Sequence, residues 1–442
     1  MCASGAAKQQ EGGLSNTWRD NLSKRLVLDH GAYMIKYSSA SEAKPQLMYN
    51  AVGKDKKNRN VYVGNKLWDE LEGGHANIQV TYPMVRGLLH DSDVETVIWK
   101  QIFSRFKKLE ERASCLALTL PPILPEIVQT RFTEVAFEDF EFDALFMSST
   151  HSMIREAAVQ EIPDLGEQCQ LVVDSGFSFT YGLPFFDSKP MRYAATRLDV
   201  GGKLLTNLLN EQISYKEVNL QGETHLVNDM KEQLSYVAKD FQEEMDICQQ
   251  KVNPIVKEFV LPDYKGVKKG YPRDPVTFLS LEEQLLAQKA AQQEQDEYAG
   301  AGRKIGLSTD QAVRIGSERF SVPEVLFHPS DIGINEAGLP EMINQVISKC
   351  PKPMERPLYA NIVIAGGNAH IKGIRERLEL DMQSIKPYDS EVRIFELQNP
   401  SQAAWRGLKQ FCSNKANFED FVVTRKEYLE EGGSRVLKKL YL

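Results

Sequence analysis

The chain of 442 residues has little of what marks a secreted, membrane or zinc-binding protein. Its six cysteines are scattered and form no CxxC pair, which argues against a zinc site and fits a reducing compartment. The N-terminal residues MCASGAAKQQEGG lack the apolar core of a signal peptide. The longest apolar stretch, residues 115–124, is interrupted by Pro121 and Pro122, so we expect no membrane span. These features predict a soluble intracellular protein.

The chain also lacks an excess of positive charge. It has 53 lysine and arginine residues against 61 aspartate and glutamate residues, a net charge of −8 at pH 7. This balance argues against a chain that wraps nucleic acid by itself, although it leaves room for a local basic patch. The length is sufficient for two domains, and the 42% apolar content is typical of a globular protein.

What the chain does contain is an internal repeat. Residues 25–37, RLVLDHGAYMIKY, and residues 171–184, LVVDSGFSFTYGLP, both predict a strand, a tight turn with a glycine and a second strand. The N–H groups of such a turn can bind phosphate oxygens. One aspartate in each copy, Asp29 and Asp174, would hold a hydrated Mg²⁺ between the turns. The repeat therefore predicts a cleft for a metal-bound nucleotide, with two unrelated hairpins as the alternative.

A glycine pair favours the cleft. Residues 361–382 read as a buried strand, a turn at Gly366 and Gly367, and a helix. The N-terminus of that helix would receive an anion, or a flat base would lie against the bare glycine backbone. Most glycine pairs only connect elements, so this signal is weak by itself.

Two helices are also predicted. Residues 226–245 carry Leu226, Met230, Leu234, Val237, Phe241 and Met245 at spacings of three and four, which predicts one amphipathic helix. Lys231 and Glu232 lie beside its apolar face and would reach a cleft, although a solvated pair is the simpler interpretation. Residues 405–411 predict a further helix near the end of the chain.

Together these residues resemble the actin family, over nearly the whole chain from about Leu26 onward. Residues 26–37 resemble the first phosphate loop of actin, and residues 171–184 resemble the second. Other segments match actin segments in the same order, namely YPMVRGLL (82–89), VIW (97–99), TRLDVGGKLLTNLL (196–209), MKEQLSYVAKDFQEEM (230–245), SERFSVPEVLFHPS (317–330) and LYANIVIAGG (358–367). The resemblance implies an α/β actin-like fold, a duplicated ribonuclease-H-like architecture with two lobes around a central nucleotide cleft.

The resemblance also implies a domain organisation and a ligand. A disordered tail over residues 1–24 precedes four subdomains, which take residues 25–43, 83–157 and 403–442 (subdomain 1), 44–82 (subdomain 2), 158–200 and 335–402 (subdomain 3) and 201–334 (subdomain 4). The implied ligand is ATP or ADP with Mg²⁺, held as a structural group. Its binding residues would be Asp29, Gly31, Lys36, Asp174, Ser175, Gly176, Gly202, Lys231, Glu232, Gly366 and Gly367, with Asp29 and Asp174 contacting Mg²⁺ through water.

Departures from actin argue against catalysis. In the first loop, Ala32 and Tyr33 replace a serine and a glycine of actin, and in the second loop Phe177 and Ser178 replace an acid and a glycine. Thr150 replaces the glutamine that orients water, and Tyr181 replaces the second-loop histidine. Ile371 replaces a base-contacting tyrosine, and Ser401 replaces a late lysine. Positioning the attacking water is the main contribution of a protein to such a hydrolysis. We therefore expect nucleotide binding without rapid hydrolysis, and no enzyme.

Two surface segments also differ from actin. Residues 53–60, GKDKKNRN, form a basic tip in place of the apolar loop that grips a neighbouring actin, which argues against a filament; a solvated loop is the simpler interpretation of the tip. A long insertion over about residues 264–311 predicts a docking element, with a tolerated surface loop as the alternative. Its predicted helix follows a capping box formed by Ser280 and Glu283. The predicted partner-binding residues are Lys265, Lys268, Lys269, Arg273, Leu281 and Leu285.

This combination is most similar to the nuclear actin-related proteins of Swr-type chromatin remodellers, the actin-related protein 6 class. The resemblance implies a non-catalytic subunit that joins the remodelling motor with a small HIT-type zinc-finger partner and contacts the nucleosome while a histone variant is exchanged. It implies a nuclear location, with an additional cytoplasmic pool left open, and no membrane contact. The alternatives are an actin-fold ATPase or phosphotransferase with its own substrate, and a cytoskeletal filament protein.

Overall fold

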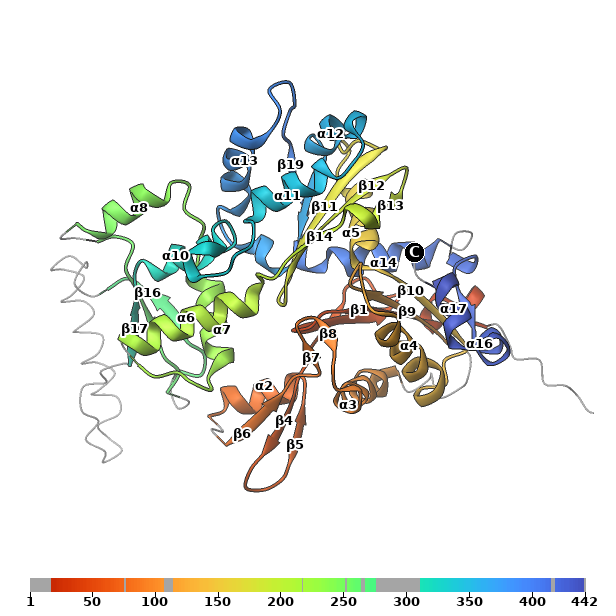
Figure 1. Ribbon diagram of the computed structural model, residues 1–442. Helices are drawn as coiled ribbons and strands as arrows, with labels where there is room; N and C mark the ends of the chain where they lie inside the picture. The colour runs from red at the N-terminus through yellow and green to blue at the C-terminus, as the bar shows by residue number, and fades with distance from the viewer. Residues whose placement is uncertain are drawn as a thin grey trace, which may run out of the picture.

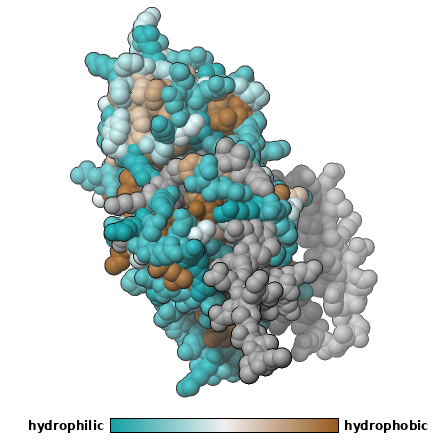
Figure 2. Space-filling view, turned by 90° about the vertical axis from the view of Figure 1, so that its right-hand side faces the viewer, coloured by the Kyte–Doolittle hydropathy of each residue, from teal (hydrophilic) through white to brown (hydrophobic). Residues whose placement is uncertain are grey.

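The computed structural model describes residues 17–74, 77–106, 114–216, 218–250, 253–263, 267–275, 311–414 and 418–440. Lys265, Leu281, Leu285 and the predicted capping box at Ser280 lie outside these residues. None of the helices in the described ranges is both long enough and apolar enough to cross a membrane. On the face shown in Figure 2, hydrophobic side chains occur as separate patches among hydrophilic ones, as is usual for a globular surface.

The first large sheet has the strand order β20-β10-β9-β1-β2-β3 (Figure 1). Its strands are β1 (Arg25–His30), β2 (Met34–Ser39), β3 (Gln46–Tyr49), β9 (Cys115–Leu120), β10 (Ala144–Ser149) and β20 (Val423–Thr424). β1 pairs antiparallel with β2 and parallel with β9. Every residue of β1, β9 and β10 is buried, as expected of parallel strands covered on both faces.

The second large sheet repeats this topology. Its path is β13-β12-β11-β18-β19, with β14 beside β12. The strands are β11 (Cys169–Ser175), β12 (Thr180–Phe186), β13 (Lys189–Pro190), β14 (Thr196–Leu198), β18 (Ile362–Ala365) and β19 (Ile394–Glu396). β11 pairs antiparallel with β12 and parallel with β18, just as β1 pairs with β2 and β9. Both predicted hairpins are therefore confirmed, and each leads one half of a duplicated α/β architecture.

Two helices lie between the large sheets, α5 (Thr150–Glu161) and α14 (Ala403–Ser413) (Figure 1). They are close packed at Gly407, where an added Cβ would stand 1.7 Å from the carbonyl oxygen of Met153. Only a glycine permits this approach. α14 confirms the helix predicted over residues 405–411.

The remaining elements cover the sheets or form the two smaller subdomains. The first lobe carries α3 (Ser92–Phe103), α4 (Glu126–Glu134), η3 (Val135–Asp139), α16 (Arg425–Glu431) and α17 (Gly433–Leu440), and the second carries η4 (Arg192–Ala194), η7 (Pro329–Ile332), α11 (Leu339–Ser348), α12 (Lys352–Tyr359), α13 (Ile374–Ile385) and η9 (Pro400–Gln402). A small hairpin, β7 (Met84–Val85) and β8 (Leu88–Leu89), precedes α3.

Of the two smaller subdomains, one lies at the bottom and the other at the left of the view in Figure 1. One consists of β4 (Val52–Asp55), β5 (Val61–Val63), α2 (Asn65–Glu72) and β6 (Ile78–Thr81). The other consists of α6 (Gly202–Lys216), α7 (Thr224–Leu234), α8 (Phe241–Cys248), β15 (Lys257–Val260), β16 (Tyr271–Arg273), β17 (Ala312–Ile315) and α10 (Glu318–Glu324).

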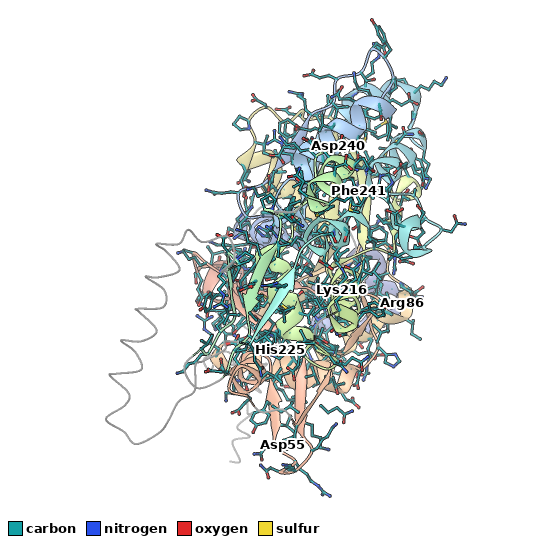
Figure 3. All side chains as sticks on the ribbon, turned by 90° about the vertical axis from the view of Figure 1, so that its left-hand side faces the viewer. Asp55, Arg86, Lys216, His225, Asp240 and Phe241 are labelled. Carbon is teal, nitrogen blue, oxygen red and sulfur yellow. The ribbon has the colours of Figure 1, made fainter. Side chains whose placement is uncertain are left out.

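The single helix predicted over residues 226–245 is wrong. α7 ends at Leu234, Ser235 is extended, and Tyr236 forms a β-bridge with Lys372 before α8 begins at Phe241. The apolar period continues through the break because both helices pack apolar side chains, but in different clusters. Met230 is buried in the main core of the second lobe, whereas Phe241 is partly buried against Phe320. Figure 3 labels Asp240 and Phe241, where α8 begins.

Residues 17–24 of the N-terminal tail that was predicted to be disordered are instead ordered. Residues 17–20 form α1 (Thr17–Asp20), and η1 (Leu22–Lys24) follows it. The side chain of Trp18 is 1% exposed and packs edge to face on Phe418. The buried guanidinium of Arg25 donates to the carbonyl oxygens of Trp18 and Cys412, which fixes the segment to the first lobe. One buried tryptophan and one buried arginine thus outweigh the polar composition around them.

The glycine pair is followed by a different element from the one predicted. A short 3₁₀ helix, η8 (Gly367–His370), comes directly after β18, and α13 begins only at Ile374. The glycine turn is therefore not the N-terminus of the long helix. The expected subdomain boundaries are not tested by these features and stay predictions.

Candidate nucleotide cleft

A cavity of about 570 Å³ lies between the two lobes. Its walls include residues of both hairpin turns, of α7 and of the glycine pair. All of the predicted nucleotide-binding residues except Ser175 line it. The volume falls within the range typical of small-molecule sites. The cavity thus brings together groups from the two halves of the repeat.

The carboxylate of Asp29 is already bound by protein groups. Lys36 Nζ lies 3.1 Å from Asp29 Oδ2, and Thr119 Oγ1 donates to Asp29 Oδ1 at 2.7 Å. Asp29 is 4% exposed. Lys36 therefore acts first as the counter-ion of Asp29, at the base of the first turn.

The pKa of Asp174 is raised toward neutral pH. Burial, and then the charge of Asp29, raises the pKa of Asp174 to about 6, although Lys36 opposes the shift. The two aspartates are thus near neighbours, as a shared hydrated Mg²⁺ requires. Among the described residues, no group of three or more histidine, cysteine, aspartate or glutamate side chains is placed to bind a metal ion. A bound Mg²⁺ would therefore depend on water and phosphate for most of its ligands.

The glycine pair contacts this acid directly. Gly366 has φ +92°, and an added Cβ would lie 2.2 Å from Ser175 O and 2.5 Å from Asp174 Oδ1. The turn after β18 can approach Asp174 only because this residue is glycine. At Gly367 an added Cβ would meet no atom within 4 Å, so its backbone faces open space in the cleft.

Lys231 has no donor left for a ligand. Its ammonium group donates to Gly202 O at 3.0 Å, Thr206 Oγ1 at 2.9 Å and Asn228 Oδ1 at 2.9 Å, which uses all three N–H groups. Lys231 is 6% exposed, and burial lowers its pKa to about 8. The side chain joins α6 to α7 and positions the wall of the cleft.

The side-chain amide of Asn368, which the sequence reasoning missed, binds the turn between β11 and β12. Asn368 Nδ2 donates to Ser175 Oγ at 3.0 Å and to Gly176 O at 2.9 Å. Ser175 faces away from the cavity, and its hydroxyl also contacts Thr180 Oγ1. Asn368 follows the glycine pair at once in the sequence, and that position is the only local signal that points to it.

Two aromatic rings meet across the phosphate end of the cleft. Tyr33 comes from the turn between β1 and β2, and Phe177 from the turn between β11 and β12. Their ring centroids lie 4.6 Å apart with an interplanar angle of 28°, so the rings are stacked. Such a pair contributes about 0.5–1.5 kcal/mol beyond the burial of its area. Both residues were identified from the sequence as departures from actin, and the structure joins them into one contact.

Tyr33 is held in this position from both sides of the cleft. Its ring packs edge to face on Tyr49 and Trp68, at centroid distances of 5.5 and 6.2 Å. Its hydroxyl oxygen accepts a hydrogen bond of 3.2 Å from Asn228 Nδ2, which also donates to Glu232 Oε1 at 2.7 Å. Burial raises the pKa of Tyr33 well above its ordinary value, so the hydroxyl stays neutral. The predicted residue Glu232 thus supports the aromatic contact through Asn228.

Thr150 and His151 are the side chains to consider at the position where actin orients an attacking water. Thr150 Oγ1 donates to Leu120 O at 3.0 Å, so its hydroxyl proton is engaged by the backbone. The adjacent His151, missed by the sequence reasoning, lines the cavity and is 1% exposed. Its Nε2 donates to Tyr181 O at 3.2 Å, while its Nδ1 has no hydrogen-bond partner within the described residues. Burial lowers the pKa of His151 to about 4, so its imidazole is neutral at pH 7.

The described members of the predicted partner-binding set lie outside the cleft and have contacts of their own. Arg273, in β16, pairs with Glu258 at 3.1 Å. Lys269 lies 3.7 Å from Asp229, and Lys268 and Lys269 line a second cavity of about 100 Å³. The basic tip predicted at residues 53–60 is the β4–β5 hairpin, and Figure 3 shows Asp55 at its far end. Asp55 Oδ1 accepts from Lys57 N at 2.7 Å, which shapes the turn.

A sequence model of the actin family matches residues 21–441. The chain belongs to the actin family. The predicted actin-like fold is thereby confirmed over almost its entire length, and the repeated hairpins are the two loops that face each other across its cleft.

Known actin-family relatives match over most of their length. The chain is 33% identical to actin-related protein 6 of Arabidopsis thaliana, over 95% of this chain and 100% of the relative. It is 32% identical to actin-related protein 6 of Drosophila melanogaster, over 92% and 97% of the two chains. It is 33% identical to actin-like protein ARP6 of Cryptococcus neoformans, over 94% of this chain and 84% of the relative. The predicted likeness to the actin-related protein 6 class is confirmed by these relatives.

Proposed function

We propose that this actin-related protein is a non-catalytic subunit of a nuclear, ATP-dependent chromatin-remodelling complex that exchanges a histone variant into nucleosomes. Its likeness to actin-related protein 6 supports this assignment. The observation that carries the non-catalytic part is the stack of Tyr33 on Phe177, because it stands between the two turns where a nucleotide's reacting phosphate would lie. The hydroxyl of Thr150 agrees with it, since its proton is donated to Leu120 O and is not free to bind an attacking water.

In the proposed role the cleft holds a structural adenine nucleotide, with Mg²⁺ bound through water by Asp29 and Asp174. A bound nucleotide would supply negative charge that links the two turns through the metal ion. The carboxylates suit a hydrated Mg²⁺, since it keeps several waters and needs few direct protein ligands. Gly367 leaves backbone open to the nucleoside, and Gly366 also lines the cavity.

The proposed partners are the remodelling motor, a small HIT-type zinc-finger subunit and, within the complex, the nucleosome. The basic β4–β5 hairpin and the insertion between β16 and β17 are the surfaces we assign to them. In this role the chain works in the nucleus, without a membrane and without a filament. The two strands that flank residues 276–310 both pair with β15, so the insertion leaves and re-enters one small sheet.

The proposal is tested by purifying the tagged chain from nuclear extract and identifying the co-purifying proteins by mass spectrometry. We expect a remodelling motor and a small zinc-finger subunit. A variant in which a short glycine–serine linker replaces residues 276–310 should remain folded and lose one or more of these partners. The matched control is Tyr388→Ala, at a fully exposed tyrosine remote from both surfaces, which should retain them. Recovery of the wild-type chain without a motor would contradict the proposal.

One observation favours a second candidate function, an actin-fold ATPase or phosphotransferase. His151 lines the cleft, its Nδ1 has no hydrogen-bond partner within the described residues, and histidine is the side chain that most often acts as a general base. A single-turnover assay with labelled ATP separates the two candidates. The second function requires turnover that His151→Ala abolishes, whereas the scaffold function predicts no turnover above the background of the Asp29→Ala variant.

A further inference from the structure

We propose that Tyr33 and Phe177 close the phosphate end of the cleft, so that it accepts a nucleoside diphosphate and excludes the γ-phosphate of a nucleoside triphosphate. This inference rests on the nucleotide site proposed above, and it names the class of nucleotide that the site takes.

The two rings occupy the place where the chain of phosphates would extend. They come from the turns that follow Asp29 and Asp174, and the outward N–H groups of such turns are the expected partners of phosphate oxygens. Rings whose centroids are 4.6 Å apart are in contact with each other. No phosphate group fits between them, so a longer phosphate chain would have to separate the rings.

Separating the rings would disturb contacts on both sides of the cleft. Tyr33 also packs on Tyr49 and Trp68 and accepts a hydrogen bond from Asn228. The turn that carries Phe177 is fixed by its backbone, because Lys203 N donates to Phe177 O at 2.8 Å. The next aromatic residue of that turn, Phe179, lies against Gly87, where an added Cβ would be 1.9 Å from its ring. Moving the ring of Tyr33 would break its own contacts, and moving the turn that carries Phe177 would break the hydrogen bond from Lys203 N and the packing of Phe179 on Gly87.

The charges at this end also disfavour an additional phosphate. The only described ammonium groups that line the cavity belong to Lys36 and Lys231. Lys36 is paired with Asp29, and the three N–H groups of Lys231 are all engaged by protein oxygens. The face of an aromatic ring carries partial negative charge, so it does not attract an anion. A terminal phosphate would meet two ring faces and two aspartates.

The opposite end of the cleft is open. At Gly367 an added Cβ would meet no atom within 4 Å. The cavity of about 570 Å³ therefore has space for a nucleoside against bare backbone while its phosphate end is shut. Together these features define a nucleotide site that is limited by the length of the phosphate chain.

The test compares ADP with a non-hydrolysable ATP analogue by isothermal titration calorimetry. The full-length chain is stripped of nucleotide with EDTA and measured with Mg²⁺ present, as wild type, Tyr33→Ala, Phe177→Ala and Tyr33→Phe. We expect the wild type to bind ADP at least about tenfold more tightly than the analogue. Tyr33→Phe keeps the ring and should keep this preference. Each alanine variant should gain affinity for the analogue and reduce the ratio to about threefold or less.

Three outcomes would overturn the inference: equal affinity of the wild type for both nucleotides, an unchanged ratio in the folded alanine variants, or failure of the wild type to bind ADP. Two alanine variants on opposite lobes keep the test decisive if one of them does not fold. The remodeller assignment is decided separately, by co-purification. If the chain prefers ADP but recovers no motor, the nucleotide inference stands and the remodeller assignment fails. If the chain recovers the motor but does not prefer ADP, the assignment stands and the nucleotide inference fails.

Discussion

Replacing Asp174 with asparagine should stabilise the ligand-free chain at neutral pH. Burial and the charge of Asp29 raise the pKa of Asp174 from 3.8 to about 6. Between these pH values the folded state binds more protons than the unfolded state, so the free energy of unfolding falls as the pH rises through this window. A shift of about two pKa units corresponds to about 3 kcal/mol at most. Since the amide carries no charge, Asp174→Asn should recover about 1–3 kcal/mol above pH 6.

Urea unfolding at pH 5 and pH 7.5, without nucleotide or Mg²⁺, measures this difference. We expect the stability gained by Asp174→Asn to be larger at pH 7.5 than at pH 5. The matched control is Asp246→Asn, at an exposed carboxylate on α8, which should change stability little at either pH. A variant less stable than the wild type at pH 7.5, or one whose gain does not depend on pH, would refute the reasoning. With Mg²⁺ and ADP added, only the wild type should gain stability.

Three further predictions concern stability. A double-mutant cycle with Tyr33→Leu and Phe177→Leu, followed by urea unfolding, should give a coupling energy of about 0.5–1.5 kcal/mol, and additive effects would show that the rings do not interact. Gly366→Ala should lower the thermal midpoint more than Gly222→Ala, because both glycines have positive φ but only Gly366 has atoms close to the added Cβ; equal effects would leave the close approach to Asp174 unsupported. Trp18→Ala should cost about 3–5 kcal/mol and expose the N-terminal segment to limited proteolysis, whereas an unchanged cleavage pattern would mean that Trp18 does not anchor it.

The features that could be predicted from the sequence are those with local causes. An Asp-x-Gly turn between two apolar runs specifies a hairpin within about a dozen residues, so both hairpins could be read directly. Their repetition predicted a cleft between two facing turns before any comparison. The departures Tyr33 and Phe177 were visible for the same reason, since each sits in a turn whose other residues were recognised.

The features that could not be predicted depend on contacts between distant segments. The break between α7 and α8 includes the bridge from Tyr236 to Lys372, which joins distant segments. Its local signal, Asp240 as the N-cap of α8, was missed. The engagement of Lys231 by Gly202 and Asn228 removes a ligand contact that its sequence position had suggested. The stack of Tyr33 on Phe177 likewise joins turns from opposite lobes. In these cases contacts between segments that are distant in the sequence decide what a residue does.

The most direct test of a cleft that is closed at its phosphate end is an experimental structure of the chain with Mg²⁺ and ADP, determined at a resolution that shows ring planes. The account predicts a nucleoside against Gly366 and Gly367, with the rings of Tyr33 and Phe177 still in contact. Rings that have moved apart, with a phosphate group between them, would contradict it.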